Sequence, residues 1–286
     1  MILVTGSTGR IGQDVAFGLV LADIQLRVLI HNGAGTEWAH WSNVETMMGD
    51  FAIPQTLDAA LDGISAAFLI SRPGPKQVEL ECAFIAACVR AGVEHVVKVS
   101  ALGAAPDAPC RFLVRHHAIE QALLASGLRA TILRPNQFMQ NVLQARSTIA
   151  PPQNRLVANI SPTTRISLVD TADVADIAVK KLFERAGASE TLEVTGPVAL
   201  TQLEVCAALS RRLNRTIAYE YLEPEAFAAT MQSYALRGDV AAGIVELHEW
   251  QNGGAAEAVT DAVVTYAGHP ARTFDEFLKR SGKKLV

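Results

Sequence analysis

The sequence predicts an α/β protein whose first half is a doubly wound parallel sheet and whose second half forms a smaller α/β domain. Short runs rich in Val, Ile and Leu alternate with stretches of helical periodicity, and half of the 286 residues are hydrophobic. Strands that are apolar throughout are typical of a parallel sheet covered by helices on both faces. The expected strands are 2–5, 26–31, 44–48, 65–70, 95–99 and 129–134.

Helical periodicity fills the intervals between these strands. Segment 33–42 stays ambiguous, because Gly33 and Gly35 disfavour a helix. The alternation of strand and helix predicts right-handed crossovers within one sheet. The expected helices are 11–22, 54–61, 76–91 and 110–126.

Beyond residue 150 the pattern is looser, so we place a domain boundary there. We expect residues 1–150 to form the larger domain and 151–286 the smaller, with 164–185 returning to the larger one as a strand over 164–169 and a helix from Thr171. Thr201 with Glu204, and Thr273 with Glu276, match the capping box of a helix start. Three further elements are expected: a strand over 216–222 and helices over 223–236 and 273–281.

Composition excludes several classes of partner. The net charge of −4 argues against a nucleic-acid surface, which would be basic. No pair among Cys82, Cys88, Cys110 and Cys206 has metal-ligand or redox spacing, so we expect free thiols in a reducing cytoplasm and no metal site. We find neither a signal peptide nor an apolar run that could cross a bilayer. The sequence therefore predicts a cytoplasmic protein without membrane contact.

A glycine-rich loop, Gly6-Ser7-Thr8-Gly9-Arg10-Ile11-Gly12, directly follows the first strand and opens an amphipathic helix. A lone glycine motif would be weak, because any tight turn can contain one. Between a strand and a helix, however, glycines let backbone N–H groups approach a diphosphate at the helix N-terminus. We therefore predict a Rossmann-type dinucleotide site. Its contacts are expected from Gly6, Thr8, Gly9, Arg10, Ile11 and Gly12.

The second strand indicates which dinucleotide binds. It ends at His31-Asn32 without the acid that holds the ribose diol of NAD. Since such an acid would repel a 2′-phosphate, NADPH is favoured and NADH stays open. Arg10 and His31 are the candidate phosphate partners, although Arg10 can equally be a solvent-exposed loop charge.

Several motifs together resemble the NmrA-like branch of the atypical short-chain dehydrogenases, over nearly the whole chain. They are the glycine loop, Gly49-Asp50, His116–Leu123, Leu133–Asn136, Phe138–Asn141, Val169–Ala175, Gly268–Pro270 and Thr273–Phe277. The resemblance implies a Rossmann domain and a smaller substrate domain. It also implies further cofactor contacts: Asp50 near the adenine, Ile70, Ser71 and Arg72 along the diphosphate and nicotinamide ribose, and Pro135, Asn136 and Phe138 around the nicotinamide.

The helix expected at 110–126 departs from the typical short-chain dehydrogenase. That family carries a Tyr and, four residues later, a Lys; here Phe112 and His116 stand at those positions, and Ser100 stands at the position of the serine. Phenylalanine has no proton to give. An alkoxide is as strongly basic as hydroxide, so it needs a proton donor as it forms. A hydroquinone anion, with a phenol-like pKa of about 10, can take its proton from water.

The candidate catalytic residues are therefore His116 and Ser100. His116 and Glu120 are four residues apart and share a helix face. Either His116 binds the nicotinamide ribose or a substrate oxygen and is oriented by Glu120, or the two form a surface ion pair.

We thus expect a reductase that transfers hydride from NADPH to a small-molecule substrate, a quinone-like or conjugated carbonyl acceptor. The alternative is a non-catalytic regulator that senses NAD(P) and acts through a protein partner, as some members of the family do. A homodimer is left open.

Overall fold

The computed structural model describes residues 1–31, 35–184, 186–231, 238–281 and 284. Its centre is a seven-stranded sheet of order β3-β2-β1-β4-β5-β6-β8, in which every pairing is parallel. The strands are β1 (Ile2–Val4), β2 (Leu26–Ile30), β3 (Val44–Met48), β4 (Ala66–Leu69), β5 (His95–Val99), β6 (Arg129–Pro135) and β8 (Glu190–Val194).

The six strands expected from the sequence are confirmed, and the parallel sheet with helices on both faces is the architecture predicted. Strand β8 is an addition that the sequence reading missed. It lies at the edge of the sheet, and its residues alternate between buried and exposed instead of forming a continuous apolar run. Strand β8 therefore has a weaker apolar signal than the inner strands.

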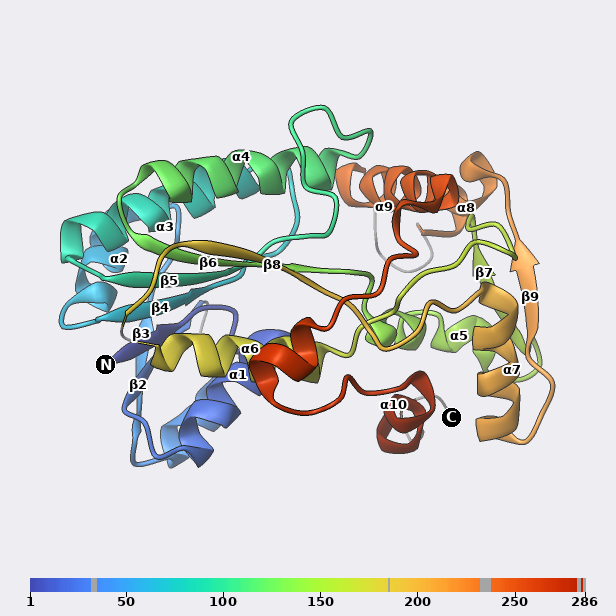
Figure 1. The fold of residues 1–286 in the computed structure, drawn as a ribbon, viewed down its shortest axis with the longest axis horizontal. Coiled ribbons are helices and arrows are strands. Elements are labelled where there is room, and N and C mark those ends of the chain that lie inside the picture. The colour runs from blue at the N-terminus through green and yellow to red at the C-terminus, as the bar shows by residue number, and fades with distance from the viewer. Residues whose placement is uncertain (32–34, 185, 232–237, 282–283, 285–286) are drawn as a thin grey trace.

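Five helices sandwich the main sheet, and each was expected within two residues of its observed ends. In Figure 1, α2 (Pro54–Leu61), α3 (Gln77–Ala91) and α4 (Arg111–Ala125) cover one face, and α1 (Arg10–Leu21) and α6 (Thr171–Phe183) cover the other. Each face has its own apolar cluster. None of the helices in the described part of the chain is long and apolar enough to cross a membrane.

The ambiguous segment 33–42 is resolved in part, since residues 32–34 lie outside the described residues. Residues Thr36–His40 form a short 3-10 helix, η1, preceded by Gly35 in the left-handed region at φ 92°. Trp38 is fully buried, and its Nε1 donates a hydrogen bond to the carbonyl oxygen of Ser7 at 3.3 Å. Trp38 therefore holds the backbone of the glycine loop through this hydrogen bond.

The second part of the chain packs beyond the edge of the main sheet (Figure 1). Strands β7 (Arg155–Ala158) and β9 (Ala218–Tyr221) form a separate two-stranded parallel sheet with its own apolar core. The helices around it include α8 (Pro224–Met231), where residues 232–236 of the expected helix lie outside the described residues. The others are η2 (Met139–Leu143), α5 (Arg146–Ile149), α7 (Gln202–Leu213), α9 (Asp239–Trp250), η4 (Gln251–Ala255) and α10 (Phe274–Ser281). The short helix η5 (Val263–Ala267) instead packs on α6, in the apolar cluster of the main sheet.

Two sequence expectations in this part have different outcomes. Both capping boxes are confirmed, with reciprocal bonds between Thr201 and Glu204 and between Thr273 and Glu276. The strand over 164–169 is wrong, since that segment forms only isolated bridges. Its backbone instead bonds to a distant loop: the N–H of Ser167 donates to the carbonyl of Ala256 at 3.0 Å. The two-domain division near residue 150 stays a prediction.

A buried histidine in β5 makes stability depend on pH. His95 is 2% exposed, and its Nε2 lies 3.0 Å from Thr131 Oγ1. Burial lowers its pKa to about 4, whereas an unfolded histidine titrates near its ordinary value of 6.5. The unfolded chain therefore gains a proton first as pH falls. Stability that is present above pH 6.5 should be lost between about 6.5 and 4, by up to about 1.4 kcal/mol for each pH unit.

Chemical denaturation of the wild type and of His95→Gln at neutral pH and at about pH 5 checks this prediction. The amide can retain the bond to Thr131 but cannot titrate, so the variant should lose less stability on acidification. Equal losses in the two proteins would contradict it.

Candidate functional site

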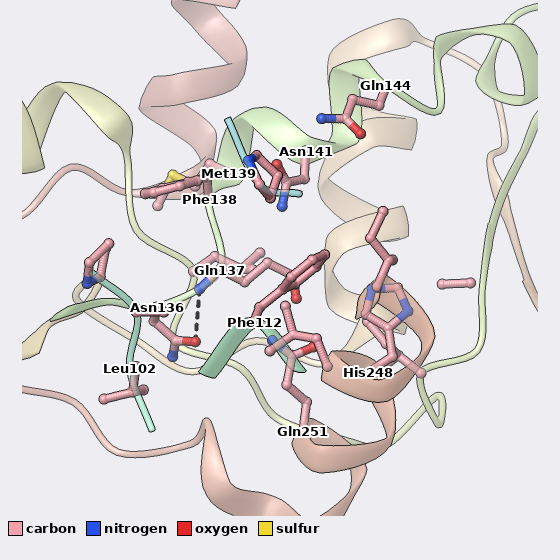
Figure 2. Close-up of a pocket in the computed structure, with 18 of the residues that line it drawn as sticks. Leu102, Phe112, Asn136, Gln137, Phe138, Met139, Asn141, Gln144, His248 and Gln251 are labelled. Atoms are coloured by element: carbon pink, nitrogen blue, oxygen red, sulfur yellow. Dashed lines mark hydrogen bonds between the residues drawn. The ribbon is translucent and has the colours of Figure 1, made fainter. Parts of the chain in front are cut away.

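The carboxyl ends of the parallel strands gather the predicted site residues at one edge of the sheet. The loops after β1, β4, β5 and β6 lie there, and a cavity of about 520 Å³ extends from the last three toward the smaller sheet (Figure 2). The predicted residues that line this cavity are Ile70, Ser71, Ser100, His116, Pro135, Asn136 and Phe138.

Two glycines of the loop after β1 are required by the fold itself. Gly6 has φ +63°, and a Cβ there would lie 2.6 Å from Ile70 Cγ2. A Cβ on Gly12 would lie only 2.2 Å from the carbonyl oxygen of Gly6. These glycines let α1 start tight against β1 and β4, so they would be needed even without a ligand.

Gly9 is different, because the protein leaves space beside it. Its φ of −93° and ψ of 168° suit any residue, and a Cβ would meet only the Gly6 carbonyl oxygen, at 3.3 Å. Helix α1 begins at Arg10 with no side-chain cap and no acid in its first turn. Its first N–H groups are thus left for an anion. The Ser7 hydroxyl is also buried without a hydrogen-bond partner. The loop therefore fits a dinucleotide diphosphate. Thr8 is exposed beside the loop, whereas the side chain of Ile11 is buried, so only the backbone of Ile11 faces the diphosphate position.

The ends of β2 and β3 hold the residues expected at the adenosine end. His31 Nδ1 lies 3.8 Å from Asp50 Oδ2, and both side chains are partly exposed. Asp50, which the family resemblance implied near the adenine, thus lies beside the end of β2, where the strand itself has no carboxylate. Its approach to His31 was not anticipated from the sequence. Arg10 is exposed, and its Nη1 lies 3.4 Å from the carbonyl oxygen of Gln140. It makes no ion pair with the described residues, so its charge is free for a phosphate.

The loop after β4 rests on a buried ion pair. Ser71 Oγ donates to Glu81 Oε1 at 2.6 Å, and Lys98 Nζ in β5 donates to Glu81 Oε2 at 2.6 Å. Both charged side chains are essentially inaccessible to solvent. Burial opposes ionisation of Glu81, but the charge of Lys98 and the hydrogen bonds from Lys98 and Ser71 together hold the pKa of Glu81 below its usual range. Ser71 therefore presents hydrogen-bond-accepting lone pairs to the cavity. Arg72 beside it is exposed.

Sequence reasoning missed the Lys98–Glu81 pair. A lysine inside the apolar run of β5 was the available signal, since lysine is almost never fully buried unless it is paired.

Phe112 has a structural role in the contact between α4 and α9. Its ring covers Gly243: a Cβ on that glycine would lie 2.4 Å from Phe112 Cζ. Ion pairs also join the two helices, from Arg111 to Glu246 at 2.5 Å and from Arg115 to Asp239 at 2.6 Å. The face of the Phe112 ring is thus part of the packing between α4 and α9.

His116 lines the cavity, and its Nδ1 is buried without a hydrogen-bond partner. Burial, reinforced by the charge of Lys98, lowers its pKa to about 3. At neutral pH the ring is uncharged, so it cannot reproduce the cationic lysine of typical short-chain dehydrogenases.

The expectation that Glu120 orients His116 is wrong, and so is the alternative of a surface ion pair. Glu120 is 1% exposed, and its carboxylate binds Ser100 Oγ at 2.5 Å and Arg134 Nη2 at 2.5 Å. Arg134 comes from β6, so a bidentate arginine takes the carboxylate that helix spacing alone assigned to His116. Ser100 donates its proton to Glu120 and, like Ser71, can only accept a hydrogen bond from a ligand.

Asn136, which is predicted to lie beside the nicotinamide, links the end of β6 to the second part of the chain. Its Nδ2 donates to Ser167 Oγ at 2.7 Å and to the carbonyl oxygen of Ala256 at 2.9 Å. Its Oδ1 accepts the N–H of Gln137 at 2.8 Å, the dashed line in Figure 2. These bonds fix the turn that carries Pro135 and Phe138, so we interpret Asn136 as a positioning residue.

Comparisons with known proteins agree with this geometry. The model of the NmrA-like family matches residues 1–278. The NAD(P)H azoreductase of Xenophilus azovorans is 33% identical over 279 residues, which cover 98% of this chain and 97% of that protein.

Two solved structures confirm the Rossmann-type fold. An NADPH complex of an NADPH-dependent quinone oxidoreductase from Escherichia coli has a TM-score of 0.88 at 23% identity, over 98% of this chain and 99% of that one. The NADP(H) complex of Citrobacter triphenylmethane reductase has a TM-score of 0.86 at 20% identity, with the same coverage.

The two kinds of glycine in the loop can be separated experimentally. Gly9→Val places a branched side chain on the open side of the loop, so we expect NADPH affinity to fall by more than about a hundredfold with little change in melting temperature. Gly12→Val drives a side chain into the Gly6 carbonyl and should lower the melting temperature sharply.

Titration calorimetry with NADPH and a melting curve for each variant make the comparison. Wild-type affinity in folded Gly9→Val would mean that the loop is only a turn.

Proposed function

Because the chain belongs to the NmrA-like family, we propose that it is an NADPH-dependent reductase that delivers hydride to a quinone-like or conjugated carbonyl acceptor. One observation carries the proposal: the cavity beside the predicted nicotinamide position contains groups that position a ligand but no ready proton donor among the described residues. The hydroxyls of Ser71 and Ser100 donate their hydrogen bonds to the carboxylates of Glu81 and Glu120. The His116 ring is held neutral, and Phe112 has no proton that it could give.

This arrangement selects among acceptors. A ketone reduced to an alkoxide needs a proton during the reaction, and nothing described here supplies one. A quinone reduced to a phenolate-like anion with a pKa of about 10 can be protonated later by water. Positioning of the acceptor over the cofactor is then the main task of the protein.

The chain's residues divide that task. When bound, reduced nicotinamide supplies the hydride. The glycine loop and the start of α1 hold the diphosphate, and Ser71, fixed by Glu81 and Lys98, accepts a hydrogen bond from a ribose hydroxyl. Pro135 and Phe138, fixed through Asn136, restrict the ring to the mouth of the cavity, and the apolar walls exclude water.

Arg10 supports NADPH over NADH as the cofactor, because it is an exposed cation at the loop with no carboxylate partner among the described residues. Asp50 beside His31 accounts for the continued possibility of NADH, since a carboxylate there can accept from a ribose diol. The relatives reported above are reductases, which supports an enzyme rather than a dinucleotide-sensing regulator.

We also propose that the protein acts on a small molecule in the cytoplasm without a nucleic-acid partner. Its net charge of −4 and its four free cysteines support this setting.

NADPH consumption by the purified protein tests the proposed function. With a simple naphthoquinone we expect turnover, and with an unconjugated ketone we expect none. Phe112→Tyr should not create ketone reduction, because the neutral ring of His116 cannot lower the pKa of the new phenol as a cationic lysine would.

Tight NADPH binding without turnover of any quinone or azo compound would overturn the enzyme and favour the sensor. Ketone reduction by Phe112→Tyr at a rate near its quinone reduction would contradict the role assigned to this position.

A further inference from the structure

The cavity is uncharged wherever it is described. None of the described residues that line it carries a charge, and the part beyond the strand ends is mostly aliphatic and aromatic. An ion would lose its hydration there without a compensating partner. The apolar residues of that part include Leu156, Phe227, Met231, Ile244, Leu247 and Trp250.

Polar side chains interrupt this apolar region, among them Asn141, Gln144 and Gln202. Two further ones lie at the end of α9 and the start of η4. His248 near the end of α9 is 8% exposed, and Gln251 at the start of η4 is 1% exposed. They are three residues apart on continuous helix and therefore share a face. Figure 2 shows His248 across the pocket from Asn136 and Leu102, with Gln251 between them. Both thus face the portion of a substrate that lies away from the nicotinamide.

The tautomer of His248 follows from its neighbour. Nδ1 lies 2.5 Å from Asn159 Oδ1, while Asn159 Nδ2 points to the carbonyl oxygen of Val245 at 3.4 Å. An amide oxygen only accepts, so Nδ1 carries the hydrogen and Nε2 carries a lone pair. Burial lowers the pKa of His248 to about 3, which keeps the ring neutral. The ring of Phe227, 5.3 Å away between centroids, holds it in place.

Both groups are acceptors without partners. His248 Nε2 makes no hydrogen bond to the described residues, and it is not one of the fully enclosed atoms, so it is open to the cavity. Gln251 Oε1 is buried and unpaired, which is unfavourable and favours a partner for it. His116 Nδ1, Gln77 Oε1 and Gln137 Oε1 are also unpaired, but they lie beside the loops predicted to hold the nicotinamide.

We propose that His248 Nε2 and Gln251 Oε1 form a recognition site for a hydrogen-bond donor, a hydroxyl or amine, on the part of the acceptor remote from the nicotinamide. The inference rests on the proposed reductase function and narrows its substrate class. The substrate is a neutral aromatic acceptor with two parts: an electrophilic part that meets the hydride and a donor-bearing ring that lies against α9. A site built around unpaired acceptors disfavours an analogue that lacks the donor.

A matched pair of quinones tests this site. We compare a naphthoquinone that bears a hydroxyl on the ring remote from the carbonyls with its methyl ether, at mildly acidic pH so that the hydroxyl keeps its proton. The wild type should prefer the hydroxyl compound in kcat/KM by about tenfold. His248→Phe retains an aromatic ring against Phe227 but removes the nitrogen, and Gln251→Met removes the amide. Each should bring the ratio toward one.

His40→Phe, an exposed substitution on η1, serves as the control and should keep the wild-type ratio. Equal kcat/KM for the two quinones in the wild type would overturn the inference and leave the reductase intact, because both compounds are reduced. Failure to reduce either would overturn the proposed function itself. An unaltered preference for the hydroxyl compound in folded His248→Phe and Gln251→Met would also overturn the proposed recognition site. If His248→Phe does not fold, the ratio of the wild type and that of Gln251→Met decide.

Discussion

Every strand of the main sheet runs in the same direction, so the loops that follow β1, β4, β5 and β6 must all meet at one edge. That constraint brings together segments more than a hundred residues apart in sequence. The close approach of Gly12 to Gly6 lets α1 begin at this edge, where its free N–H groups fit an anion. The buried Lys98–Glu81 pair fixes the next loop, and the Glu120–Arg134 pair fixes the ends of β5 and β6. The cofactor position is thus set by the sheet.

The substrate cavity depends on a second contact, between α4 and α9. Phe112 packs on Gly243, and ion pairs of Arg111 with Glu246 and of Arg115 with Asp239 join the same two helices. The position that holds a proton-donating tyrosine in typical short-chain dehydrogenases has thereby become part of the packing that closes the cavity. This exchange limits the chemistry to acceptors whose reduced form needs no immediate proton. It also brings α9, with His248 and Gln251, over the cavity.

The parts of the molecule that were predictable have a local signal. Short runs rich in apolar residues predicted six of the seven strands of the main sheet, and the position of the glycine loop between a strand and a helix indicated a dinucleotide site. Phe112 was placed by spacing alone. Strand β8 lacked such a run. The role of α9 depends on the contact between Gly243 and Phe112, which are 131 positions apart in sequence and meet only in the folded protein.

The error over Glu120 has the same origin. Helix spacing predicts which residues share a helix face, but it does not predict which side chain of a neighbouring strand binds them. Arg134 does so with two hydrogen bonds, and the geometry that follows changes Ser100 from a donor into an acceptor.

The central claim is that hydride passes directly from a cofactor held by the glycine loop to an acceptor in the adjoining cavity. Single-turnover oxidation of NADPH deuterated separately at each face of its nicotinamide C4, with a naphthoquinone in excess, tests it most directly. A cofactor fixed in one orientation predicts a primary isotope effect for one deuterated form and none for the other. Equal rates for both forms and for unlabelled NADPH would contradict direct transfer from an oriented nicotinamide.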